Sequence, residues 1–297
     1  MSSRTAGILR SVRSAVPSWR GSLRTPRRVD SPFAGLHKTG KIGPGEEWSD
    51  AKNYQPGDDV RRIDWPATAR SGEVQVRSTL ADRGLRLTLV VDCSPSMQFG
   101  TDTLTKADLA LATAAAVSLV AARQGDSVAA MLVKPDGNLW IEPGSGVSHI
   151  NVLLKTLEHS FATEGPVSFT NGLHRAGANT LSSGMFVVIS DFFDEGIGPV
   201  LRTISSKHRT LAIVVEDSRE FELVPAGLVE VFDPETEEYF LFDSDSKSFA
   251  QRFAALADTR RQFREELLRS SGAEVHKLVC GPDWLQDLSK VVSRGTK

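Results

Sequence analysis

Apolar, strand-like segments alternate with helical segments over residues 86–279, and this alternation is what most constrains the fold. Residues 86–92 read RLTLVVD and residues 185–190 read MFVVIS, which is typical of strands that are buried on both faces. Further strands are predicted at 127–133, 138–142, 210–215 and 273–279, with helices at 106–123, 149–159, 170–178 and 248–270. Strands that alternate with helices form βαβ units, so we predict an α/β fold with a doubly wound, mostly parallel six-stranded sheet.

The expected strand order is the Rossmann-like 3-2-1-4-5-6, counted along the chain. Turn residues at 134–137 predict that the third strand returns antiparallel, at an edge of the sheet. Residues 228–232 and 238–242 flank a second turn and predict an inserted β-hairpin between the fifth strand and the last large helix.

Two aspartates fall at the carboxyl ends of strands that this order places side by side. Asp92 ends the first strand and Asp191 follows the fourth. Doubly wound sheets bind ligands at the carboxyl ends of their strands, at the point where the strand order reverses. We therefore expect both carboxylates to face one crevice.

The first of these aspartates begins an Asp-x-Ser-x-Ser pattern. Asp92, Ser94 and Ser96 are alternate residues, so an extended turn would present their three oxygens on one side. Oxygen ligands of this kind suit Mg²⁺ or Mn²⁺, and Asp191 can add a second carboxylate. Cys93 lies between the ligands and is expected to pack inside.

This pattern resembles the metal-ion-dependent adhesion site of von Willebrand factor A domains. A second resemblance is more specific: residues 54–65 read YQPGDDVRRIDW, and Ala69-Arg70 and Val76-Arg77 follow. They resemble the signature of domain-of-unknown-function family 58, whose members place it just before a von Willebrand A-like domain. The resemblance covers roughly residue 35 to the C-terminus.

The family's third metal-binding loop usually supplies a threonine. In the family's spacing that position falls on Val167, which has no side-chain oxygen. Ser168 is one residue away and Thr170 is a second candidate. We expect Ser168 to replace the threonine or the metal to be held weakly.

Charge and composition divide the rest of the chain. Residues 1–29 hold seven arginines and no acid, whereas the whole chain has a net charge of −2, so the remainder carries −9. We predict a disordered basic arm at 1–29, although Ile8, Leu9, Val12, Val16 and Trp19 could form one face of a membrane-surface helix that Pro17 interrupts.

Residues 30–85 are expected to be an irregular lead-in packed on the main domain, 86–297. The charged residues of the lead-in are predicted to form a structural ion-pair network: Asp58, Asp59, Arg61, Arg62, Asp64, Arg70 and Arg77.

An acidic body argues against nucleic acid as a partner. The longest apolar run is too short and too interrupted for an integral membrane span. Only two cysteines occur, which favours a reducing compartment, and we expect a cytoplasmic protein.

No Gly-x-Ser-x-Gly or His-Glu-x-x-His motif is present, so no catalytic nucleophile or base is recognisable. The resemblance implies a non-enzymatic, metal-dependent protein-interaction module, in which an acidic side chain of a partner completes the metal. It also implies a functional pairing with a MoxR-type AAA+ ATPase in chaperone-like assembly. The alternative is a metal-dependent hydrolase that uses the same Asp/Ser site.

Overall fold

The computed structural model contains two compact units, residues 1–25 with 84–297 and residues 26–83, and each is described by itself. The structure describes residues 3–19, 51–53, 63–77, 85–101, 103–161, 165–180, 182–194, 196–233 and 238–294.

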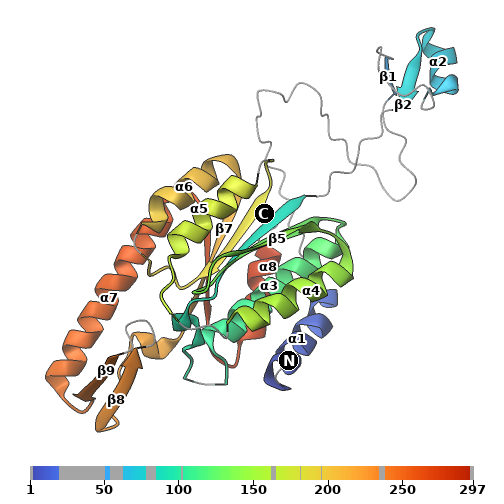
Figure 1. Ribbon diagram of the computed structural model, residues 1–297. Helices are drawn as coiled ribbons and strands as arrows, with labels where there is room; N and C mark the ends of the chain where they lie inside the picture. Colours follow the sequence, from blue (N-terminus) through green and yellow to red (C-terminus); the bar gives the residue numbers. More distant parts are fainter. Residues whose placement is uncertain are drawn as a thin grey trace. The chain divides into compact units, whose positions relative to one another are not determined.

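The larger unit is built on a six-stranded sheet (Figure 1). Its strands are β3 (Arg86–Asp92), β4 (Ser127–Val133), β5 (Leu139–Gly144), β6 (Met185–Ser190), β7 (Arg209–Glu216) and β10 (Glu274–Val279). They lie in the order β10-β7-β6-β3-β4-β5, with only β5 antiparallel to its neighbour. Counted along the chain this is 3-2-1-4-5-6, so the predicted fold, strand order and antiparallel edge strand are confirmed.

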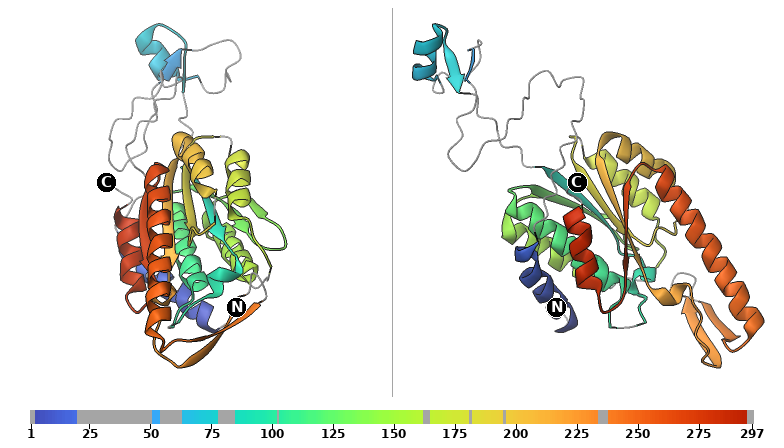
Figure 2. Two further views of the ribbon diagram at one scale, coloured as in Figure 1. Left: turned by 90° about the vertical axis from the view of Figure 1, so that its left-hand side faces the viewer. Right: turned by 180° about the vertical axis from the view of Figure 1, so that it is seen from behind.

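Helices cover both faces of the sheet (Figure 2). One face carries α3 (Lys106–Arg123), α4 (Gly146–Ser160) and α8 (Trp284–Arg294); the other carries α5 (Phe169–Asn179), α6 (Ile197–Lys207) and α7 (Lys247–Ser270). Alternate residues of β3 serve the two cores, since Leu89 packs with the first set and Val90 with the second. Helix α8 was not expected from the sequence pattern.

Helix α3 is apolar on all sides and almost entirely buried. Its start is fixed by a capping box, in which Thr105 and Asp108 exchange hydrogen bonds. Gly125, at φ 75°, lies just beyond its end, a conformation that suits glycine. Because the sheet covers only one side of α3, the other sides need neighbouring helices.

One of those neighbours is α1 (Ser3–Ala15), and it corrects the prediction of disorder for this part of the basic arm; residues 20–29 lie outside the described residues. Ile8, Leu9, Val12 and Val16 are buried in the same core as α3. Arg4 forms an ion pair with Asp108 at 2.5 Å, and Arg123 donates to the carbonyl oxygen of Val16 at 2.7 Å. The amphipathic pattern is therefore real, but its apolar face packs on the domain, and Pro17 lies in a 3-10 turn that follows the helix. Among the described helices, none is long and apolar enough to cross a bilayer.

The predicted hairpin is confirmed as β8 (Leu228–Asp233) and β9 (Glu238–Asp243). It lies beside the first turns of α7 and extends beyond the ends of the sheet strands (Figures 1 and 2).

The smaller unit was expected to be irregular, but its described residues form β1 (Ala51–Asn53), α2 (Trp65–Ser71) and β2 (Gln75–Arg77). β1 and β2 pair antiparallel. Asp58, Asp59, Arg61 and Arg62 of the predicted ion-pair network lie outside the described residues.

Candidate functional site

The Asp-x-Ser-x-Ser turn places its oxygens together at the end of β3. Asp92 is buried, and its Oδ1 accepts the amide of Ser94 at 3.0 Å. The hydroxyls of Ser94 and Ser96 lie 2.9 Å apart. Cys93 is fully buried in the apolar core, as predicted. The turn thus directs three polar side chains one way and the thiol the other.

The loop after β6 brings Asp191 to the same place. Ser96 Oγ donates to Asp191 Oδ2 at 3.2 Å, and Ser190 Oγ donates to Asp92 Oδ2 at 2.7 Å. The hydroxyl of Ser190 in turn accepts the amide of Phe192, which has φ 58°, a left-handed backbone unusual for phenylalanine. The structure therefore joins Asp92, Ser94, Ser96 and Asp191, which the strand order led us to expect together. We call these four residues the Asp92 cluster.

A buried lysine that the sequence analysis missed completes this arrangement. Lys106, the first residue of α3, is 1% exposed. Its Nζ donates to Asp191 Oδ2 at 2.9 Å and also contacts Glu220 Oε1. An available signal was that a lysine at a helix N-terminus opposes the helix dipole and needs carboxylates nearby.

Arg264 of α7 fixes the same loop from the other side. It is buried, donates to the backbone carbonyl of Asp191 at 3.1 Å, and pairs with Glu216 at 2.6 Å. Its guanidinium also lies 4.8 Å from the ring centroid of Phe193. The position of Asp191 is therefore set by contacts from two helices, α3 and α7.

Acidic side chains outnumber basic ones in this region. The acids at the ends of β3, β6 and β7 are Asp92, Asp191, Glu216, Asp217 and Glu220. The buried cations among them are Lys106 and Arg264, with Lys277 at the edge, 3.4 Å from Glu216. The excess of negative charge favours an added cation.

The protonation of these groups follows from their surroundings. Burial raises the pKa of Asp92 from 3.8 to about 6, and the charge of Asp191 adds to this, while hydrogen bonds from Ser190 and Ser94 oppose it. Burial alone would lower the pKa of Lys106, but the carboxylates of Asp191 and Glu220 outweigh burial and raise it above its ordinary value. Lys106 is therefore a permanent cation, whereas the charge of Asp92 is costly.

The third loop makes its hydrogen bonds at the start of α5 and to the loop that carries Asp191. Ser168 is exposed and caps α5, where its Oγ accepts the amide of Asn171 at 3.4 Å. The Oγ1 of Thr170 donates to Asp194 at 3.2 Å, so the start of α5 is fixed to the loop that carries Asp191. Val167 packs against the apolar core. The assignment of Ser168 or Thr170 as a ligand stays a prediction.

The four residues of the Asp92 cluster fit a hard divalent cation. They offer two carboxylates and two hydroxyls in a buried, net negative setting, which is the donor type that Mg²⁺ prefers. Among the described residues, no group of three or more His, Cys, Asp or Glu side chains could hold a metal. An ion at this site would thus depend on the serine hydroxyls and on water.

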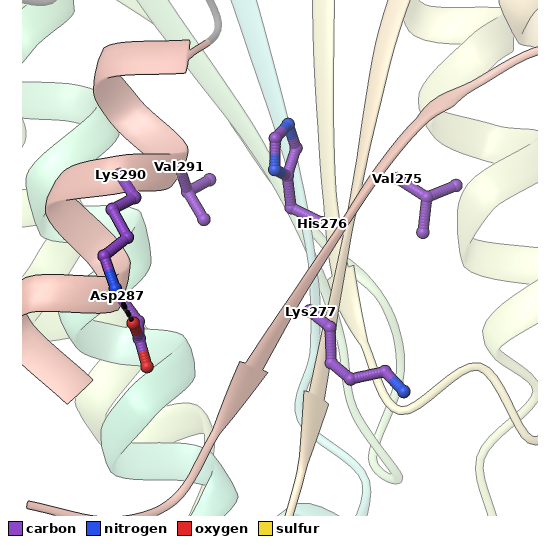
Figure 3. A pocket seen from close by; sticks show the side chains of 6 residues that line it. All are labelled: Val275, His276, Lys277, Asp287, Lys290 and Val291. Atoms are coloured by element: carbon purple, nitrogen blue, oxygen red, sulfur yellow. Dashed lines mark hydrogen bonds and ion pairs between the residues drawn. The ribbon is translucent and has the colours of Figure 1, made fainter. Parts of the chain in front are cut away.

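A separate surface hollow of about 390 Å³ lies between β10 and α8 (Figure 3). His276 and Lys277 of β10 line it together with Asp287 and Lys290 of α8. Lys290 pairs with Asp287 at 2.8 Å, and His276 with Glu274 at 3.0 Å. Because its charges are paired locally, we assign the hollow no role.

Residues 50–263 match the family model described as protein of unknown function DUF58. The chain belongs to the DUF58 family. Uncharacterized proteins of Mycobacterium tuberculosis and Mycobacterium bovis are 34% identical to this DUF58 protein in an alignment of 280 residues, which covers 91% of this chain and 86% of theirs. The resemblance to this family that the sequence suggested is thereby confirmed.

Solved structures similar to this DUF58 protein include von Willebrand A domains. BatB from Bacteroides thetaiotaomicron has a TM-score of 0.44 at 13% identity, covering 71% of this chain and 98% of BatB. The SpRpn10 VWA domain has a TM-score of 0.38 at 11% identity, covering 69% of this chain and 93% of that domain. The strand order of this chain, with its antiparallel edge strand, itself gives an α/β fold with a doubly wound, mostly parallel sheet.

Proposed function

We propose that this protein is a non-enzymatic protein-interaction module that binds its partner through Mg²⁺ or Mn²⁺. The observation that carries the proposal is the convergence of Asp92, Ser94, Ser96 and Asp191 at the switch point of the sheet, beside an excess of acidic side chains. Ser168 is proposed as a further hydroxyl ligand. When bound, the ion supplies an open coordination position that an acidic side chain of the partner can fill.

The contacts of the Asp92 cluster favour binding over hydrolysis. Both carboxylates already accept hydrogen bonds from serine hydroxyls, and Asp191 is held by Lys106. In the described part of the chain, the hydrogen bonds that we find at the cluster involve no histidine, so the hydrolase alternative lacks the commonest general base.

Titration calorimetry with Mg²⁺ and Mn²⁺ tests the site. Wild type should bind, and Asp92→Asn should not, because the variant loses the charge while it keeps the shape. Asp258→Asn, at an exposed position of α7, is the matched control and should bind like wild type. Equal heats for wild type and Asp92→Asn would contradict the proposal. Turnover of p-nitrophenyl phosphate that a chelator abolishes would favour the hydrolase instead.

The proposed partner is a MoxR-type AAA+ ATPase, as the family resemblance implies, in chaperone-like assembly in the cytoplasm. Co-purification of the two proteins should require Mg²⁺ and fail with Asp92→Asn. Association that is equally strong in chelator and in Mg²⁺ would show that the partner does not bind through the metal.

A further inference from the structure

The outer face of the β8–β9 hairpin combines apolar and acidic side chains. Residues paired across two strands lie on the same face, and the register pairs Leu228 with Asp243 and Glu230 with Leu241. Leu228, Tyr239 and Leu241 are 74%, 67% and 69% exposed. Each of the two pairs therefore sets a carboxylate beside an aliphatic side chain on an open surface.

The inner face of the hairpin is held by the domain near its base, whereas Val231 and Phe240, further along the same face, are 43% and 49% exposed. Phe242 stacks on Phe249 of α7, with ring centroids 4.7 Å apart and an interplanar angle of 21°. At the base of the hairpin, Ser244 Oγ accepts the amide of Ala226 and donates to the carbonyl of Gly227, each at 2.8 Å. A two-stranded sheet is marginal alone, so these contacts fix its orientation and leave the opposite face open.

The charge of the hairpin segment has a single sign. Residues 222–246 contain eight acidic residues and no lysine or arginine. Exposed apolar side chains that lie together commonly mark interaction sites, and a surface of one charge attracts partners of the other. An anionic membrane surface or a nucleic acid would be repelled, so a basic protein segment is the favoured occupant.

We propose that the outer face of the β8–β9 hairpin is a docking surface for a basic amphipathic segment of a partner protein. Aliphatic side chains of that segment pack on Leu228 and Leu241, and its lysines or arginines pair with Glu230 and Asp243. This surface differs in chemistry from the metal site, which would take an acidic side chain.

The loop that carries Asp191 and the segment that leads to the hairpin follow the carboxyl ends of β6 and β7, at the same end of the sheet. Phe221, in the segment that leads to the hairpin, lies 6.4 Å from Phe193 beside Asp191, measured between ring centroids. Arg261 of α7 lies over the Phe221 ring at 4.0 Å. The segment that leads to the hairpin is therefore packed beside the loop that carries Asp191.

The test uses the full chain and a fluorescent synthetic peptide with leucines and lysines at helical spacing. Binding of the peptide to the protein is measured by fluorescence anisotropy at low and at high salt. The same peptide with glutamate in place of lysine is the control ligand. Leu241→Ser and Glu230→Lys should each weaken binding about tenfold. Val152→Ser on α4 and Glu142→Lys on β5 are matched exposed controls and should bind like wild type. Thermal melting checks that every variant is folded.

The result expected is salt-sensitive binding of the lysine peptide that depends on Leu241 and Glu230. The proposal is overturned if the lysine peptide does not bind, if the glutamate peptide binds equally, or if the hairpin variants match their controls. Binding of anionic phospholipid vesicles that Leu241→Ser abolishes would instead identify a membrane surface as the occupant. None of these outcomes depends on Mg²⁺, so they are separable from the failure of the metal proposal.

Discussion

Replacing Asp92 by asparagine is expected to stabilise the protein while it removes the proposed metal site. The pKa of Asp92 is 3.8 before folding and about 6 in the fold, a difference that corresponds to about 3 kcal/mol at 1.36 kcal/mol per pKa unit. Between those pH values the folded chain holds a proton that the unfolded chain has lost. The wild-type protein therefore loses stability as the pH rises from about 4 to about 6, and the whole cost is present at pH 7.5.

Asparagine has no charge to bury, but its amide nitrogen is a donor and cannot accept the hydrogen bond that Asp92 accepts from Ser190. Ser190 Oγ donates to Asp92 Oδ2 at 2.7 Å, and the loss of that acceptor costs about 1 kcal/mol. The expected net gain is thus about 2 kcal/mol at pH 7.5.

Urea denaturation in chelator, at pH 7.5 and again near pH 4.5, measures this gain. The advantage of Asp92→Asn should shrink at the lower pH, where wild-type Asp92 is protonated in the fold. Mg²⁺ should then raise the stability of wild type and leave the variant unchanged, because only a folded site that binds the ion gains from it. Asp258→Asn controls for the general loss of one surface charge. A variant that is less stable than wild type at pH 7.5, or a gain that does not change with pH, would refute the reasoning.

Four further outcomes are expected. Lys106→Met should lower the free energy of unfolding by about 3–5 kcal/mol in urea, because two carboxylates stay buried without their ammonium; a loss as small as that of a surface lysine would contradict the pairing. Arg264→Met should cost a similar amount, about 3–5 kcal/mol, and also weaken Mg²⁺ binding in calorimetry, since it releases the carbonyl of Asp191; unchanged metal affinity would show that α7 does not position the loop. Leu9→Ala should cost about 2–5 kcal/mol, with the exposed Arg10→Ala as its control, and equal melting temperatures would mean that α1 does not dock in solution. Ser168→Ala should weaken Mg²⁺ binding by about 0.5–1.5 kcal/mol if that hydroxyl is a ligand, and wild-type affinity would exclude it.

The strand order and the meeting of Asp92 with Asp191 could be predicted because both follow from the alternation of strands and helices. Lys106 and Glu220 could not be paired in this way, since Glu220 lies in a short 3-10 helix after β7 (Ser218–Glu220), whose direction does not follow from the alternation of strands and helices. A lysine at the first position of an apolar helix was the available sign that a buried carboxylate lies nearby.

At the N-terminal segment, the amphipathic pattern was recognised correctly, but the surface on which its apolar face packs was not. The spacing of Ile8, Leu9, Val12 and Val16 indicated an amphipathic helix, but composition and Pro17 favoured disorder. The relevant sign lies in another part of the chain. Helix α3 has no polar face, so the side of α3 that faces away from the sheet must be buried by another element. Only the packed structure shows that α1 is such an element.

The Asp92 cluster also bears on the order in which the chain matures. Asp92 and Ser190 are 98 residues apart in the sequence, and Lys106 and Glu220 are 114 apart. During synthesis the ammonium of Lys106 is made long before its second carboxylate, and it must stay in water until β6 and β7 have joined the sheet. Contacts of such separation form late, after the entropy of closing the intervening chain has been spent. A nascent or truncated chain that ends before residue 220 therefore lacks the second carboxylate that holds Lys106, and binding through the cluster would report that the sheet has been assembled as far as β7.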